Sequence, residues 1–211
     1  MRKSNALKSA LAAAFAISAA TLATAGSAKA EEVYFIRGAF NVFSQGMNQM
    51  VSQLRARGVN AKGLSNGQWS GIANDIIKRH KQGRVSFPIV VAGHSVGGQE
   101  APRFSDKLWQ AGIPVALVIG VDPGFAPPPK FSAGAPRVVN FWIPGSARGN
   151  PYKAAGAFQG SIRNVSIRDF GSTVDHVGID KDPVVQRQIV AEVMATVARK
   201  PAAEEAAATS E

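Results

Sequence analysis

Apolar and polar residues follow two different periods along this chain. Short apolar runs, typical of strands buried on both faces, are separated by segments whose apolar residues recur every three or four positions, as in helices. We expect strands over residues 33–36, 59–61, 87–92, 114–119, 138–143 and 165–167. We expect helices over about 43–54, 72–80, 98–110 and 183–197.

Strands that alternate with helices favour a parallel sheet with helices on both faces. The last helix is the best marked, because Asp182 suits the N-cap and Pro183 the first helical position. The predicted fold class is therefore α/β: a three-layer sandwich with a mostly parallel central sheet of about six strands flanked by helices. Sites in such sheets form beyond the carboxyl ends of the strands.

The first 30 residues read as a secretory signal peptide. Basic residues open the chain, an apolar stretch covers 10–23, and Ala28-Lys29-Ala30 is a small-x-small cleavage site. We expect cleavage before Glu31, a periplasmic or secreted domain over 31–200, and a disordered tail over 201–211, which has no apolar face. An uncleaved anchor is disfavoured because the stretch is short and rich in alanine.

The basic surplus is scattered. Of the 24 Lys and Arg, four lie in the expected leader, which leaves 20 against 14 acidic residues and a net charge of +6. No basic stripe with interleaved aromatics is visible, so we expect no nucleic-acid partner. The densest patch, 78–84, is interpreted as a solvated helix end, with weak attraction to an anionic envelope surface as the alternative.

The most informative segment is Gly93-His94-Ser95-Val96-Gly97. It joins an expected buried strand to an expected helix, which is the setting of a nucleophile elbow. In that turn the serine adopts a strained backbone, and the flanking glycines let strand and helix pass closely. Ser95 is the predicted nucleophile.

A serine hydroxyl needs a base, and histidine is the usual one. The chain has three histidines. His80 is expected on the surface, and His94 inside the elbow should point away from Ser95. His176 follows the last strand on a loop that can reach the carboxyl edge of the sheet, so we predict it as the base.

The base needs an acid that holds its tautomer. Asp122 follows the strand after the elbow strand and is the first candidate, although it could instead serve as a turn residue before Pro123. Asp175 ranks second, because side chains adjacent in sequence generally diverge, and Asp169 ranks third.

Negative charge on the attacked carbonyl oxygen requires backbone donors. One is the amide of Val96, and the other should come from the first loop, at Ala39 or Phe40. No metal or cofactor is expected, because the chain has no cysteine and no histidines at ligand spacing.

With the elbow and the order Ser95, Asp122, His176, the chain resembles the α/β-hydrolase superfamily over 33–199. Compared with the superfamily the chain looks trimmed. The segments 123–137 and 144–160 are too short for a sizeable helical lid, so we expect an open site, similar to small esterases, cutinase-like enzymes and thioesterases. The position of Asp122, after the strand that follows the elbow strand, is similar to that of the acid in some lipases. Many members of the superfamily have the acid one strand later.

The predicted function is an exported serine hydrolase that cleaves carboxylic esters or thioesters, small or lipid-like, through an acyl-enzyme on Ser95. A non-catalytic binding protein on the same scaffold is one alternative. A peptidase or amidase is another, because the same elbow chemistry would serve it. The acyl group, the leaving group and the oligomeric state do not follow from the sequence.

Overall fold

The computed structural model describes residues 31–39, 44–134, 136–146 and 149–198. Within them six strands form one sheet, all paired in parallel, in the order β2-β1-β3-β4-β5-β6. The strands are β1 (Glu32–Ile36), β2 (Ala61–Leu64), β3 (Ile89–His94), β4 (Leu117–Val121), β5 (Arg137–Trp142) and β6 (Ser161–Ser166).

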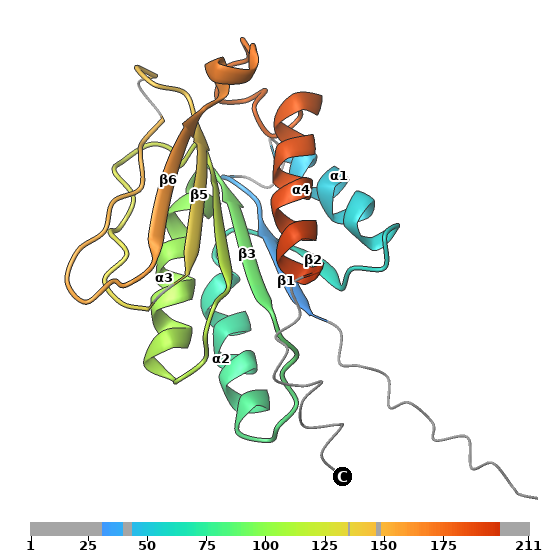
Figure 1. Cartoon of the computed structure of the whole chain (residues 1–211), viewed down its shortest axis with the longest axis vertical. Helices are drawn as coiled ribbons and strands as arrows, with labels where there is room; N and C mark the ends of the chain where they lie inside the picture. The colour runs from blue at the N-terminus through green and yellow to red at the C-terminus, as the bar shows by residue number, and fades with distance from the viewer. Residues whose placement is uncertain (1–30, 40–43, 135, 147–148, 199–211) are drawn as a thin grey trace, which may run out of the picture.

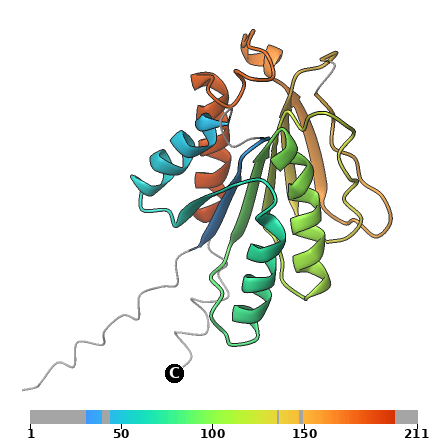
Figure 2. The same cartoon turned by 180° about the vertical axis from the view of Figure 1, so that it is seen from behind.

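Helices cover both faces of this sheet. Those described are α1 (Gln45–Arg55), α2 (Trp69–His80), α3 (Val96–Gln110), α4 (Pro183–Ala198) and a short 3-10 helix, η1 (Ile167–Phe170). In Figure 1, α1 and α4 lie on one face and α2 and α3 on the other, and Figure 2 shows the same layers from behind. The predicted three-layer α/β sandwich is confirmed.

Two separate cores follow from this layering. Successive side chains of a strand point to opposite faces, so Val33 and Phe35 of β1 pack under α1 and α4, whereas Tyr34 and Ile36 pack under α2 and α3. Both faces of the central strands are therefore apolar. This burial fixes the register that brings the carboxyl ends of β1, β3 and β4 to one edge.

Four expected strand ranges are wrong by two or more residues at an end. The strand before Ser95 is Ile89–His94 rather than 87–92. The second strand is Ala61–Leu64 rather than 59–61, because the Val59 amide still bonds the carbonyl of Leu54. β4 begins at Leu117, the first residue in register with β3, rather than at 114. The last strand is the edge strand Ser161–Ser166, whose exposed, polar pattern gave no apolar signal, and Ile167 belongs to η1.

Several predictions lie outside the described residues: the signal peptide, the tail over 201–211, Phe40, and the expected start of the first helix at Phe43. Among the described ranges, no helix has the length and apolar character needed to cross a membrane.

The start of α4 is as predicted. Oδ1 of Asp182 accepts hydrogen bonds from the amides of Val184 (2.7 Å) and Val185 (3.1 Å). Its Oδ2 accepts a bond from the hydroxyl of Ser172 at 2.6 Å. The N-cap therefore also closes the loop that carries His176.

Candidate active site

Ser95 lies between β3 and α3 in a conformation that non-glycine residues rarely adopt, with φ 56° and ψ −118°. Its amide donates to the carbonyl of Val121 at 3.1 Å, which ties the turn to the neighbouring strand. The residue is 4% exposed. Strain of this kind persists only where the surroundings hold it, and it is the signature expected of the elbow.

The two glycines that flank the elbow allow the chain to pass itself closely. A Cβ on Gly93 would lie 2.1 Å from the carbonyl oxygen of Gly97. A Cβ on Gly97 would lie 2.4 Å from the carbonyl oxygen of Ile36 in β1. Because both obstacles are backbone atoms, they cannot rotate away.

Gly97→Ala should therefore destabilise the fold by about 1–3 kcal/mol or more, the usual cost of overpacking. Gly71→Ala in α2 is the matched control, because its Cβ would meet nothing within 4 Å. It should be neutral or stabilise by up to about 1 kcal/mol. Urea unfolding midpoints measure both changes. Equal midpoints for the two variants would contradict the close approach.

His176 contacts both of its predicted partners. Its Nε2 lies 2.9 Å from Ser95 Oγ, and its Nδ1 lies 2.7 Å from Asp122 Oδ2. Asp122 is fully buried and His176 is 8% exposed. An ionised carboxylate only accepts, so Nδ1 carries the proton and Nε2 is left to accept the serine hydroxyl proton.

Backbone constraints hold Asp122 in this pose. Its φ is 43°, its amide donates to the carbonyl of Phe141 at 2.8 Å, and Oδ1 accepts the amide of Ile143 at 3.0 Å. A Cβ on Gly149 would lie 2.3 Å from Oδ1. Two neighbouring segments therefore close around the carboxylate.

The lower-ranked acids are not at the site. Asp175 is exposed, and its Oδ1 accepts the amides of Val177 (3.1 Å) and Gly178 (2.9 Å), so it shapes the turn beside His176. Asp169 is exposed in η1. Of the three carboxylates weighed from sequence, the structure brings Asp122 to the histidine.

His94 points away from Ser95 and joins two other parts of the site. Burial lowers the pKa of His94 to about 4, with His176 as a smaller cause, so the ring is neutral. Its Nε2 lies 3.0 Å from the backbone carbonyl of His176, which can only accept. Nδ1 is then the acceptor for the hydroxyl of Ser44 at 2.8 Å, and Ser44 Oγ accepts the amide of Gly38 at 2.8 Å. One chain of hydrogen bonds thus links the first loop to the backbone of His176.

Of the three predicted oxyanion donors, the structure describes Val96 and Ala39. The Val96 amide opens α3 directly after Ser95, at the positive end of the helix dipole. The first loop comes close as well, because a Cβ on Gly38 would lie 2.9 Å from Ser95 Cβ. Ala39 follows Gly38 at this point and stays a prediction as a donor, as does Phe40, which lies outside the described residues.

Asp180 is a fully buried carboxylate on the His176 loop, against the first turn of α1. Burial raises the pKa of Asp180 to about 6, and the nearby amides of Gly46 and Met47 only partly oppose the rise. Neither oxygen accepts a hydrogen bond of good geometry from the described residues. The folded state therefore binds this proton more tightly than the unfolded state does.

This burial predicts a pH dependence of stability. Between the ordinary value of 3.8 and about 6, the folded state holds a proton that the unfolded state has lost. The free energy of unfolding should therefore fall by about 1–3 kcal/mol as pH rises through that window, relative to Asp180→Asn. Urea unfolding at several pH values measures it, with the exposed Asp169→Asn as control. A wild-type curve parallel to that of Asp180→Asn would contradict the prediction.

Gly124 and Phe125 form the rim of the site beside His176, a contact that the sequence did not predict. A Cβ on Gly124 would lie 2.6 Å from His176 Cε1 and 3.2 Å from Ser95 Oγ, so a larger residue would block the pair. Phe125 has φ 70°, is 61% exposed, and stands edge-on to the His176 ring at 5.9 Å. No helix occurs in the described parts of 123–160, in keeping with the expected lack of a sizeable lid.

Sequence reasoning missed Ser44, Gly124, Gly149 and Asp180, and it gave Phe125 no contact with His176. Each acts through a contact with a residue distant in sequence, as with Ser44 and His94, 50 positions apart. The glycines gave the only local hint, since a glycine beside a catalytic segment can mark close approach. Within the described ranges, no three His, Cys, Asp or Glu side chains cluster closely enough to hold a metal.

No protein-family model matches the sequence, and no curated protein matches it significantly. Solved structures do match. The NocB thioesterase domain, in covalent complex with a fluorophosphonate nocardicin G analogue, aligns with TM-score 0.50 and 12% identity over 81% of this chain and 96% of that one. The chain has an α/β-hydrolase fold.

Two further solved structures align with the chain. A second structure of the NocB thioesterase domain, from the nocardicin cluster, aligns with TM-score 0.50 and 12% identity over 81% of this chain and 95% of that one. RedJ with a polyethylene glycol molecule bound in its active site aligns with TM-score 0.49 and 11% identity, over 80% and 94%. At these identities the likeness concerns the fold.

Proposed function

We propose that the protein is a serine hydrolase that cleaves carboxylic esters or thioesters through an acyl-enzyme on Ser95. The observation that carries the proposal is the position of His176, 2.9 Å from Ser95 Oγ and 2.7 Å from Asp122 Oδ2. Nucleophile, base and acid come from three separate loops at one edge of the sheet. Such an arrangement is recognised by geometry and roles.

In the proposed reaction, Ser95 Oγ attacks the acyl carbon while His176 Nε2 takes its proton. Asp122 stabilises the imidazolium and keeps Nδ1 as the donor. Amides of Val96 and of the first loop bind the developing oxyanion. His176 then gives its proton to the departing alcohol or thiol. Water deacylates Ser95 by the same steps in reverse.

Two features support an acyl substrate with an apolar part. The solved NocB structure is of a thioesterase domain, and its ligand is a covalently bound fluorophosphonate. In this chain the exposed ring of Phe125 stands edge-on to the His176 ring, and His176 is the residue that would give its proton to the leaving group. An apolar group there would cover the ring and bury its surface.

A fluorophosphonate probe tests the proposal. We expect stoichiometric modification of Ser95, located by mass spectrometry of the digested protein, and none in Ser95→Ala. A folded wild-type protein that takes up no probe would favour a non-catalytic binding protein instead. The rates of hydrolysis of an ester, a thioester and an amide that share the same acyl group then distinguish esterases and thioesterases from peptidases and amidases.

We also propose that the mature enzyme is exported and begins at Glu31, as the basic start, the apolar stretch and the Ala28-Lys29-Ala30 site suggest. N-terminal sequencing of protein recovered from a periplasmic or culture fraction tests this. Full-length protein confined to the cytoplasm would contradict it.

A further inference from the structure

A small cavity lies beside the first loop, between α1 and the end of β2. Its volume is about 280 Å³, near the lower limit for ligand sites, so it suits a small group. Its lining residues are Arg37, Asn48, Val51, Ser52, Arg55 and Gly63. Two of them are cationic, two are polar and neutral, and none is acidic.

The two arginines have spare donors. Arg37 donates to Ser65 Oγ at 2.7 Å, and Arg55 Nε donates to the carbonyl of Ala61 at 2.7 Å. Among the described residues no carboxylate pairs with either guanidinium. Arg37 Nε is buried and has no hydrogen-bond partner there. A guanidinium has five donors, so most of this capacity is unused.

An unpaired buried donor is costly, and two like charges beside one cavity repel each other. An oxyanion in the cavity would remove the repulsion between the two charges, because guanidinium groups match phosphate and carboxylate oxygens in pairs. The hydroxyl of Ser52 supplies a further donor at the same place. Asn48 Nδ2 already donates to Gln45 Oε1 at 3.0 Å, and its Oδ1 lies toward Gly63. Gly63 keeps the wall open, since a Cβ there would lie 3.1 Å from Asn48 Oδ1.

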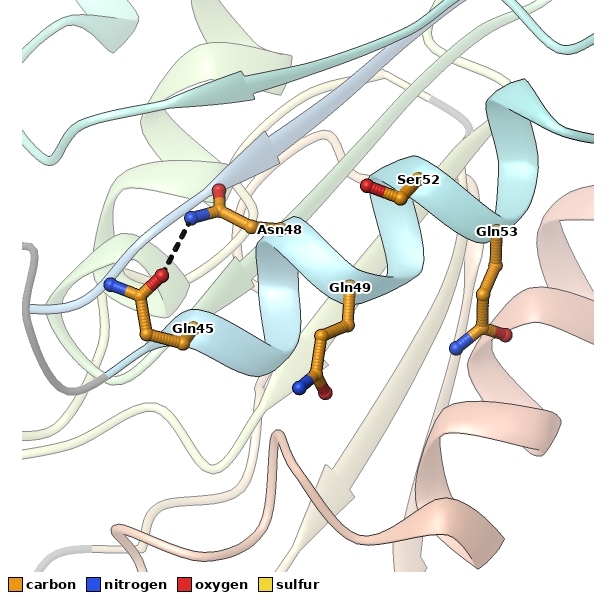
Figure 3. Close-up of a pocket in the computed structure, with 5 residues that line it drawn as sticks. All are labelled: Gln45, Asn48, Gln49, Ser52 and Gln53. Atoms are coloured by element: carbon orange, nitrogen blue, oxygen red, sulfur yellow. Dashed lines mark hydrogen bonds between the residues drawn. The ribbon is translucent and has the colours of Figure 1, made fainter.

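The neighbouring cavity on α1 shows the contrast. It is lined by Gln45, Asn48, Gln49, Ser52 and Gln53 (Figure 3). These side chains are neutral, and their amides bond one another or Gln186 of α4. In Figure 3, Asn48 and Ser52 project toward the strands, whereas Gln49 and Gln53 project to the other side of the helix. Asn48 and Ser52 line both cavities. The contrast therefore lies in Arg37 and Arg55, which line only the arginine cavity and which no described carboxylate pairs.

We propose that the arginine cavity is a binding site for an oxyanion, a phosphate or carboxylate group. Its position brings it near the candidate active site. Arg37 directly precedes Gly38, whose Cβ would lie 2.9 Å from Ser95 Cβ. The anion therefore comes from one of two sources: a remote group of the substrate itself, or a free anion that binds beside the first loop.

Titration of the full chain with inorganic phosphate at constant ionic strength tests the site by calorimetry. We expect saturable binding of one phosphate, weakened about tenfold or more in Arg37→Gln and in Arg55→Gln, since charge-assisted hydrogen bonds are lost. Arg57→Gln is the matched control, because Arg57 is exposed, bonds the carbonyl of Gln53, and does not line the cavity. It should bind phosphate as the wild type does.

Absence of saturable binding would overturn the proposal, and so would equal affinity in all three variants. Arg55 is exposed, so Arg55→Gln decides the matter even where Arg37→Gln does not fold. This titration is independent of the proposed hydrolase activity. Failure of the fluorophosphonate probe to label Ser95 would reject the hydrolase and leave the titration valid.

A second measurement identifies whether the anion belongs to the substrate or is free in solution. It rests on the proposed function, because it uses ester hydrolysis as its readout. Two nitrophenyl esters of equal acyl length, one ending in a carboxylate and one in its methyl ester, give a kcat/KM ratio for each variant. A ratio that falls about tenfold in Arg55→Gln but not in Arg57→Gln assigns the anion to the substrate. If the ratio is unchanged but phosphate binding is lost, the natural occupant of the arginine cavity is a free anion. Both results support anion binding in this cavity.

Discussion

Replacing Ser95 by alanine should lower kcat/KM for a short nitrophenyl ester by about four to six orders of magnitude. The substitution removes the attacking oxygen that lies 2.9 Å from His176 Nε2. His176→Ala should lose as much, because the two side chains act as one unit and their effects do not add. The double variant should therefore be no slower than either single one.

Ser105→Ala is the matched control for the serine. It is buried on the same helix, α3, but the site described above does not include it. We expect its activity within a few fold of the wild type. Ser95→Ala protein that hydrolysed the ester at the wild-type rate would reject the proposed nucleophile. Unfolding curves for both variants separate loss of chemistry from loss of fold.

Asp122→Asn should lower kcat by about three to four orders of magnitude while the fold is kept. The asparagine oxygen can still accept the amide of Ile143, which bonds Oδ1 at 3.0 Å in the wild type. Its amide nitrogen would then face His176 Nδ1 and donate to it. The ring would have to carry its proton on Nε2, where it could no longer accept the proton of Ser95.

Asp175→Asn distinguishes the two acids weighed from the sequence. Asp175 is exposed and accepts only backbone amides within its own turn. Its variant should retain activity within about tenfold, because an asparagine oxygen can accept the same bonds. A greater loss in Asp175→Asn than in Asp122→Asn would contradict the assigned geometry.

Much of the fold could be predicted because its central strands are buried on both faces. The apolar runs in β1, β3 and β5 were visible as continuous segments, and the alternation with helices left few topologies. The predictions failed at strand ends and at β6, where burial is incomplete. There the tertiary register with a neighbour, and not the local pattern, decides where a strand begins.

The candidate site divides in the same way. The elbow is recognisable locally, since a serine between two glycines at a strand-to-helix turn occupies five neighbouring residues. The contact that requires Gly97 is nevertheless distant in sequence, because it is with Ile36 of β1. The ranking of Asp122 above Asp175 followed from its place after a strand. No local rule could find the links from Ser44 through His94 to the His176 carbonyl, which join segments 50 and 82 residues apart.

The sequence by itself determined the class of fold, the serine turn and the candidates for the base and the acid, because burial period and glycine spacing are visible in neighbouring positions. Only the tertiary structure decided which carboxylate faces His176 and how a neutral His94 connects the first loop to the His176 carbonyl. It also decided that Arg37 and Arg55 line one cavity in which no described carboxylate pairs with them. These depend on segments that become neighbours only when parallel strands end at one edge. Distances between such segments are set by packing on both faces of the sheet.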